Sequence, residues 1–379
     1  MNNRKKFILL PDYITFLFRM LRISFFLLLT CLWTYTIKAQ TKAPKYSNEF
    51  LKLGVGADAA GMGNTRIGIA NDVTSGYWNP AGIAFIEEPQ LALMHNEYFA
   101  GIAKYDYGAY AMPLQDNRYF GASFLRFAID DIPNTLNFKD GNSFNYDKIT
   151  SFSVADMALL LTYAQKFQDQ LALGANLKII HRKIGDFANA WGFGIDIGAR
   201  YSNEKFHAGV ILKDVTTTFN AWTFNTELFE DAFAQTGNEI PQNSIELTLP
   251  SLNFGAGYTL GDKEKWAATF ALDFQTNFDG KRNVLANVSR VSFDPHLGVE
   301  GTFKNTVFLR AGVMNFQKLT NLDNKKVISV YPTAGIGFNI MNFAQIDYAL
   351  SNIGNLKQNL YSHIFSLRLN LGKILQKNY

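Results

Sequence analysis

The sequence has little charge, a single cysteine and, beyond its first forty residues, no long apolar run. Charged residues make up 18% of the 379 positions, whereas soluble domains carry about 25%. No stretch after residue 40 approaches the roughly 20 apolar residues that a membrane-spanning helix needs. Yet 47% of the residues are hydrophobic and 15% are aromatic. This combination favours a β-barrel in a membrane, where only every second residue of a strand has to be apolar.

The only cysteine, Cys31, lies in an N-terminal segment that is typical of a secretory signal. Arg19 and Arg22 precede an apolar run over residues 23–32, and Ala39 supplies a small residue before a cleavage point. We therefore predict a signal peptide over residues 1–39, with Met20 as an alternative start that makes the signal more compact. A retained membrane anchor is the less favoured interpretation. The mature chain then has no cysteine, which excludes disulfides, thiol catalysis and cysteine-ligated metals.

Motifs for catalysis or cofactor binding are also absent from the sequence. The five histidines, at positions 95, 181, 207, 296 and 363, are isolated, and no two have the spacing of metal ligands. No G-x-S-x-G motif occurs, and the glycines at 54, 56, 61 and 63 match neither G-x-G-x-x-G nor a P-loop. The net charge of +4 is scattered, so no nucleic acid partner is expected. We expect a protein that is not an enzyme and that has no cofactor or metal.

From about residue 90 the sequence alternates between large apolar residues and small or polar ones. In the segment 187–201, Phe193, Ile195 and Ile197 share one face, while positions 192, 194, 196 and 198 hold glycine or aspartate. Successive side chains of a strand point to opposite faces. Several such segments run ten residues or more, and a tilted strand needs about 9–11 residues to cross a bilayer. Strands in soluble proteins are usually about 5–6 residues long.

The lengths of the connections between these segments follow a rule. Every second connection is short, as at 114–118, 168–170, 203–205, 261–265, 304–305 and 341–342. The others include 130–152, 214–248 and 278–292, and only the first of them, around Gly101, is short. Outer-membrane barrels have short periplasmic turns and longer outer loops. We therefore predict an all-β fold, a transmembrane, antiparallel outer-membrane β-barrel of about fourteen strands over residues 90–379. Both termini are expected in the periplasm of a Gram-negative bacterium.

The longest connection, 214–248, contains Glu227, Glu230 and Asp231 in a partly helical pattern. Loops on a rigid scaffold often carry binding residues. The loop is interpreted either as a surface that contacts a partner or ligand, or as a solvated cover. Its candidate contact residues are Trp222, Phe224, Glu227, Phe229, Glu230 and Asp231.

Residues 40–89, between the signal and the first strand, include the glycine-rich stretch GMGNTRIGIANDVTSGYWNPAGIA. The segment is too apolar for a disordered linker and too short to form a core of its own. A barrel of fourteen strands has a lumen too wide for side chains to fill, because about eight strands already reach that limit. We therefore predict a plug inside the lumen, with Asn79 as an N-cap, Pro80 as the first helical residue and Gly82 to end the turn. The residues expected to set the plug are Gly61, Gly63, Trp78, Asn79, Pro80 and Gly82.

Residues 46–86, which begin YSNEFLKLGVG and end YWNPAGIAFI, resemble the N-terminal region of the PorV/PorQ family of outer-membrane proteins. The PorV-like branch is the nearer one, and the segment is more loosely similar to FadL-type outer-membrane transporters. The FadL-type resemblance implies a fourteen-stranded barrel with an N-terminal hatch. The PorV/PorQ resemblance implies a component of the type IX secretion system. Such a component binds translocon proteins, attachment-complex proteins or the sorting domains of exported cargo.

Two functions of different classes remain open from the sequence. The first is an interaction protein of the type IX secretion and sorting system that acts through partner or cargo binding. The alternative is a FadL-like channel for hydrophobic small molecules, which needs an apolar pocket between plug and wall. Met62, Trp78, Ile83 and Phe85 are candidates to line it. A lateral wall opening beside such a pocket would favour the channel, and a sealed lumen with a protruding loop surface would favour the partner. Outer-membrane lipid is an expected partner in both cases.

Overall fold

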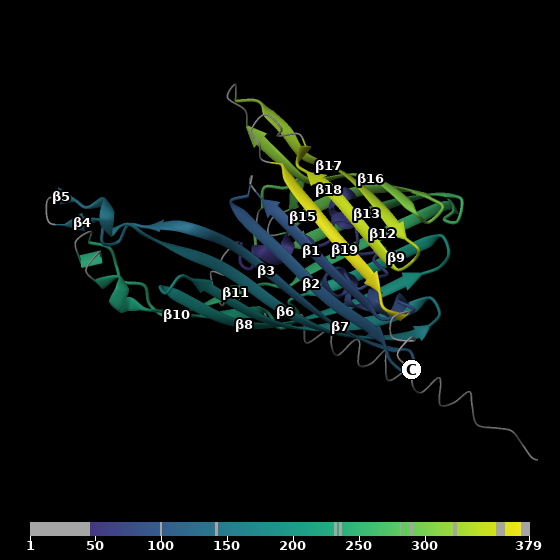
Figure 1. Cartoon of the computed structure of the whole chain (residues 1–379), viewed down its shortest axis with the longest axis horizontal. Helices are drawn as coiled ribbons and strands as arrows, with labels where there is room; N and C mark the ends of the chain where they lie inside the picture. Colours follow the sequence, from purple (N-terminus) through teal and green to yellow (C-terminus); the bar gives the residue numbers. More distant parts are fainter. Residues whose placement is uncertain are drawn as a thin grey trace, which may run out of the picture. The chain divides into compact units, whose positions relative to one another are not determined.

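The computed structural model describes residues 46–98, 101–140, 143–230, 233–234, 237–280, 282–288, 291–320, 324–353 and 361–372. The predicted signal segment lies outside these ranges. An antiparallel sheet closes on itself because β1 (Gln90–Tyr98) pairs with both β2 (Ala103–Pro113) and β19 (Ser362–Asn370). Figure 1 shows that the strands of the wall run side by side at a similar tilt. Among the described residues, no helix is long and apolar enough to cross a membrane.

The wall has the fourteen strands that the alternation predicts. The remaining ones are β3 (Arg118–Asn134), β6 (Thr150–Gln168), β7 (Leu171–Ile184), β8 (Ala188–Ser202), β9 (Phe206–Lys213), β12 (Ser251–Asp262), β13 (Trp266–Asn277), β15 (Val291–Phe303), β16 (Val307–Thr320), β17 (Lys326–Ile340) and β18 (Ala344–Ser351). The short strand β14 (Ala286–Val288) pairs beside the start of β15.

The wall is apolar outside and small or polar inside, the reverse of a soluble protein. Along β8 the burial alternates at almost every residue. Trp191, Phe193 and Ile197 are exposed on the outer face, whereas Asp196 and Arg200 are buried in the lumen. An outer band of this kind is what a bilayer requires of a transmembrane barrel.

The two ends of the barrel differ in their connections. One end of the barrel, the turn end, carries the short turns 114–117, 169–170, 203–205, 263–265, 304–306 and 341–343. The first residue of β1, which follows the plug, and the last residue of β19 also lie at this end. Three of these turns contain two successive residues with positive φ, for example Lys304 (51°) and Asn305 (47°). Tight hairpins need this backbone conformation, because its twist matches that of the strands. The opposite end, the loop end, carries the long connections 135–149, 214–250 and 278–290, together with two short ones at 99–102 and 185–187.

The predicted loop 214–248 is not a single loop. Its two ends form β10 (Thr218–Phe224) and β11 (Ser244–Thr248), which pair with each other. β10 also pairs with the first half of β8, so these strands prolong the wall at the loop end. Asp214 and Thr217 adopt positive φ (57° and 61°), and they interrupt the strand between β9 and β10. Residues 218–224 are therefore part of the wall, whereas the partly helical pattern expected at Glu227 coincides with the short helix η4 (Thr226–Leu228).

Other short elements at the loop end are β4 (Lys139–Asp140), β5 (Ser143–Phe144), η3 (Tyr146–Lys148) and η4 (Thr226–Leu228). We call residues 135–149 and 218–248 the loop-end extension. Figure 1 shows β4 and β5 well beyond the β1–β2 end of the wall, on the side of β10. β3 reaches this region because it continues to Asn134 past a bulge between Ile129 and Ile132.

Residues 46–89 occupy the lumen, as the sequence predicts, and are called the plug below. They form η1 (Glu49–Lys52), α2 (Ala57–Gly61), α3 (Ser75–Trp78) and η2 (Pro80–Phe85). Their hydrogen bonds reach strands on all sides of the closed sheet: β7, β8, β13, β17 and β19. Only a segment inside the barrel can contact its wall in this way.

Plug and wall approach each other so closely because glycines face each other across the gap. A Cβ added at Gly312 of β16 would lie 2.3 Å from the carbonyl carbon of Met62, and one at Gly174 of β7 would lie 2.5 Å from the amide nitrogen of Ala81. Real Cβ atoms do not approach other atoms so closely. The glycines on the inner face of the wall thus let the plug backbone rest against the wall backbone.

Candidate functional site

Asn79 connects the plug to the wall. Its side-chain oxygen accepts a hydrogen bond from the Ala81 amide (3.2 Å), which caps η2, and Pro80 follows at the first helical position. Its side-chain nitrogen donates to the Ile67 carbonyl (3.2 Å) within the plug and to the Ala199 carbonyl (3.1 Å) of β8. A single fully buried amide therefore fixes the start of a helix and its position against the barrel.

The other predicted plug residues act through close packing. The Gly61 carbonyl accepts from Thr333 Oγ1 (3.1 Å), and the Gly63 carbonyl accepts from His296 Nδ1 (2.7 Å). Trp78 Nε1 donates to the Val55 carbonyl (3.1 Å). Gly82 does not end the helical turn, because η2 continues to Phe85. A Cβ at Gly82 would instead lie 2.6 Å from the Ala70 carbonyl oxygen, so the glycine allows a close contact inside the plug.

A buried ion network anchors the plug on the opposite side of the lumen. Asp72, whose side chain is 3% exposed, accepts from Arg66 (2.6 Å) of the plug and from Arg368 of β19. Arg66 also pairs with Asp58 (3.1 Å). Burial alone would raise the pKa of Asp72, but Arg368, Arg66 and the hydrogen bonds from Thr74 together lower that pKa well below its ordinary value. The carboxylate therefore stays ionised inside the lumen.

The candidate residues of the 214–248 segment separate into two groups. Trp222 donates from Nε1 to Glu246 (2.8 Å), Phe224 stacks beside Trp222, and Phe229 packs against Phe187 at 5.5 Å between ring centroids. These aromatic residues stabilise the loop-end extension. Glu227 and Glu230 are exposed to solvent, and Asp231 lies outside the described residues.

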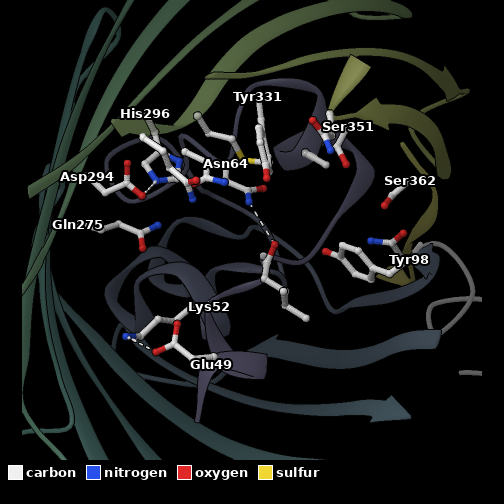
Figure 2. A pocket seen from close by; sticks show the side chains of 18 of the residues that line it. Glu49, Lys52, Asn64, Tyr98, Gln275, Asp294, His296, Tyr331, Ser351 and Ser362 are labelled. Carbon is white, nitrogen blue, oxygen red and sulfur yellow. Dashed lines mark hydrogen bonds and ion pairs between the residues drawn. The ribbon is translucent and has the colours of Figure 1, made fainter. Parts of the chain in front are cut away.

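A cavity lies between the plug and the loop end of the wall. Its volume is about 480 Å³, and Figure 2 shows side chains from the plug and from both sides of the barrel pointing into it. No sequence motif marks it, because its residues come from strands far apart in the chain. Its lining includes Glu49, Lys52, Leu53 and Asn64 of the plug and Met94, Asn96, Tyr98, Gln275, Asp294, His296, Met314, Asn315, Gln317, Tyr331, Ser351 and Ile364 of the wall.

The four plug residues expected to line an apolar pocket do not line this cavity. Met62 and Ile83 have no exposed surface, and Trp78 is 3% exposed. Trp78 packs edge-to-face on Tyr77, with 5.0 Å between ring centroids. Trp78 and Ile83 belong to the core between plug and wall, and Phe85 packs against it partly buried. The four side chains therefore pack the plug, the other role that the sequence allows for them.

The wall is interrupted beside the cavity. Pairing between β15 and β16 ends at Leu297 and Val313, and pairing between β17 and β18 ends at Thr333 and Ser351. Beyond these points the β16–β17 hairpin continues to its tip with no further partner strand among the described residues. β16 also bulges between Met314 and Gln317, where Asn315 adopts φ 53°. The bulged residues line the cavity, so this break in the hydrogen-bond ladder and the cavity adjoin each other.

One side of the cavity holds a cluster of paired charges. Lys52 donates to Glu49 (3.0 Å) and to Asn277 (3.0 Å). Arg282 donates to both carboxylate oxygens of Glu49 (3.2 and 3.0 Å) and also pairs with Asp279. Burial lowers the pKa of the Lys52 ammonium, and the Glu49 carboxylate acts in the opposite direction. Both basic groups are thus occupied by protein acceptors.

Across the cavity, Asp294 and His296 lie on the same inner face of β15. His296 Nε2 is 3.7 Å from Asp294 Oδ2, and the His296 side chain is only 6% exposed. Figure 2 shows the two side chains next to Asn64 of the plug. Within the described residues, no group of three or more His, Cys, Asp or Glu side chains is placed to hold a metal ion.

Neither a protein-family model nor a curated protein sequence matches this chain. Solved structures do match it. The toluene transporter TodX of Pseudomonas putida aligns with a TM-score of 0.52 at 13% identity, covering 84% of this chain and 98% of TodX. The CymD monoaromatic hydrocarbon channel gives 0.53 at 13% identity, with coverage of 84% and 97%. The toluene transporter TbuX of Ralstonia pickettii gives 0.50 at 14% identity, with coverage of 84% and 98%.

At these identities the likeness concerns the fold. It confirms the predicted closed antiparallel β-barrel of fourteen strands. No matching family model or curated sequence supports membership of the PorV/PorQ family. All three similar structures are transporters or channels rather than enzymes.

Proposed function

We propose that the protein is an outer-membrane channel for hydrophobic small molecules, with its loop end outside and both termini in the periplasm. The observation that carries the proposal is the cavity of about 480 Å³ above the plug, next to the place where β16 leaves β15. A ligand pocket with mixed apolar and polar lining is the usual form of a small-molecule site. The fold shared with two toluene transporters and a monoaromatic hydrocarbon channel supports the same function.

Filling the cavity is expected to block transport. In Gln317→Trp the indole enters the cavity, whereas Lys318→Trp places the same side chain on the opposite, exposed face of β16. We expect uptake of a small aromatic hydrocarbon such as toluene into proteoliposomes to fall about tenfold for Gln317→Trp, because an occupied site loses roughly 1.4 kcal/mol or more of binding. Lys318→Trp should transport like the unmodified protein. Equal uptake by both variants would show that the cavity is not on the route.

A second proposal is partner binding by the loop-end extension, in the manner of a type IX secretion component. The observation that favours it is an ordered and acidic outer surface. Phe229 packs between Phe187 (5.5 Å) and Phe233 (5.3 Å), which stabilises this region. Phe144 and Tyr146 remain 63% and 72% exposed, and the sequence contains no basic residue between Lys213 and Lys263.

Removal of the 225–243 segment separates the two proposals. We expect mild-detergent purification of the tagged protein from native outer membranes to recover translocon proteins, attachment-complex proteins or cargo with sorting domains, if partner binding is its role. The version with residues 225–243 replaced by a short glycine–serine link should lose them, while toluene uptake is kept. Recovery of the barrel with lipid alone would contradict the secretion role.

A further inference from the structure

Asp294 and His296 face the cavity from β15 with buried hydrogen-bonding atoms. His296 Nδ1 donates to the Gly63 carbonyl (2.7 Å), and since a carbonyl only accepts, Nδ1 carries a proton. Nε2 lies 3.7 Å from Asp294 Oδ2. It is an acceptor in the neutral imidazole and the donor of this ion pair in the imidazolium. Neither His296 Nε2 nor Asp294 Oδ1 has a hydrogen-bond partner among the described residues. Buried acceptors of this kind are rare in folded proteins and call for a donor.

Among the described lining residues, the basic groups are Lys52 and Arg282, together with His296. Lys52 and Arg282 are engaged by Glu49, Asn277 and Asp279, as described above. A ligand carboxylate placed beside Asp294 would meet a like charge in a poorly solvated site. A ligand that donates a hydrogen bond would satisfy Asp294 Oδ1.

The rest of the cavity suits an apolar body. Leu53, Met94, Met314 and Ile364 contribute aliphatic and thioether surface, and Tyr98 lies across the cavity from Asp294 (Figure 2). The volume of about 480 Å³ is several times that of a cavity of roughly 150 Å³ that holds benzene. There is therefore room for a substituted ring or a short chain in addition to its polar group.

We propose that the cavity binds small amphiphiles that combine an apolar body with one primary ammonium or hydroxyl group, which donates to Asp294 Oδ1, with His296 Nε2 as a second acceptor when the imidazole is neutral. This inference rests on the proposed channel function and adds a requirement that a hydrocarbon does not meet. The ammonium form is favoured over the hydroxyl, because Asp294 supplies a negative charge as well as an acceptor.

The test compares four probes of one shape with the full-length protein in detergent. They are 4-methylbenzylamine, 4-methylphenol, toluene and 4-methylbenzoate, and binding is followed by calorimetry and by saturation-transfer NMR. We expect the amine and the phenol to bind about tenfold or more tightly than toluene, and the benzoate to bind most weakly. Asp294→Asn should reduce the preference for the amine over toluene about tenfold. Asp186→Asn removes a carboxylate that is 89% exposed at the same end of the barrel and should change nothing.

The outcomes separate this inference from the proposed function. Equal binding of all four probes, or tightest binding of the benzoate, would overturn the donor requirement and leave the channel function intact. Absence of binding by every probe, together with unchanged uptake in Gln317→Trp, would remove the channel function as well. The probe series on the unmodified protein decides the preference even where Asp294→Asn does not fold.

Discussion

A valine at position 298 is expected to displace the plug, whereas a valine at position 301 of the same strand should leave it in place. A Cβ at Gly298 would lie 2.3 Å from Thr65 Oγ1 and 2.4 Å from the Met62 carbonyl oxygen. At Gly301 the nearest atom is the Leu309 carbonyl oxygen, at 3.9 Å. Rotation of Thr65 can relieve the first contact, but the second is with plug backbone and no side-chain rotation relieves it.

Overpacking of this kind costs about 1–3 kcal/mol and occasionally more. A cost of about 3 kcal/mol shifts the balance between seated and displaced plug roughly a hundredfold. We expect Gly298→Val to admit an uncharged sugar in liposome-swelling assays and to make residues 46–89 sensitive to protease. Gly301→Val is the matched control, and heat-modifiable gel mobility reports that both barrels have folded. If the two folded variants show the same permeability and the same cleavage, the close seating of the plug on β15 is wrong.

Asp72→Asn is expected to loosen the plug from the other side of the lumen. The change removes a buried charge on which Arg66 and Arg368 converge. Loss of one partner from a buried ion pair costs about 3–5 kcal/mol, because the remaining charge is left uncompensated. Here we expect about 3 kcal/mol, since Arg66 keeps Asp58 and Arg368 keeps Gln345. The thermal unfolding midpoint, measured by near-ultraviolet circular dichroism, should fall clearly, and that of Asp186→Asn should not.

The same carboxylate predicts how plug stability depends on pH. The pKa of Asp72 is lower in the folded protein than its ordinary value of 3.8. Its stabilising contribution is therefore complete above pH 3.8 and is lost as the pH falls through the lower, folded-state pKa. We expect the unmodified protein to lose stability in this acid range, and Asp72→Asn to lack this part of the loss. Identical acid profiles of the two proteins would show that Asp72 is not ionised in the lumen.

The 214–248 segment shows where reasoning from the sequence fails. The sequence predicts a single long connection here, with a partly helical pattern only at Glu227, Glu230 and Asp231. Asp214 and Thr217 break the alternation with left-handed backbone, and Thr218–Phe224 becomes a strand because the long β8 offers it a free edge. Strand formation depends on the partner as much as on the segment itself. Pairing between segments distant in the chain is not visible in either segment alone.

Patterns of near neighbours determined the barrel from the sequence by itself. Alternation separates the outer face from the lumen, loop lengths identify the two ends, and Asn79 followed by Pro80 marks a helix start, because each signal depends on residues close in the chain. The cavity, the pairing of Asp72 with Arg368 and the contact of His296 with Gly63 were decided only by the tertiary structure. Closure of the sheet places the plug against strands that lie hundreds of residues away in the sequence. The local sequence pattern does not specify which inward-facing side chains then contact each other.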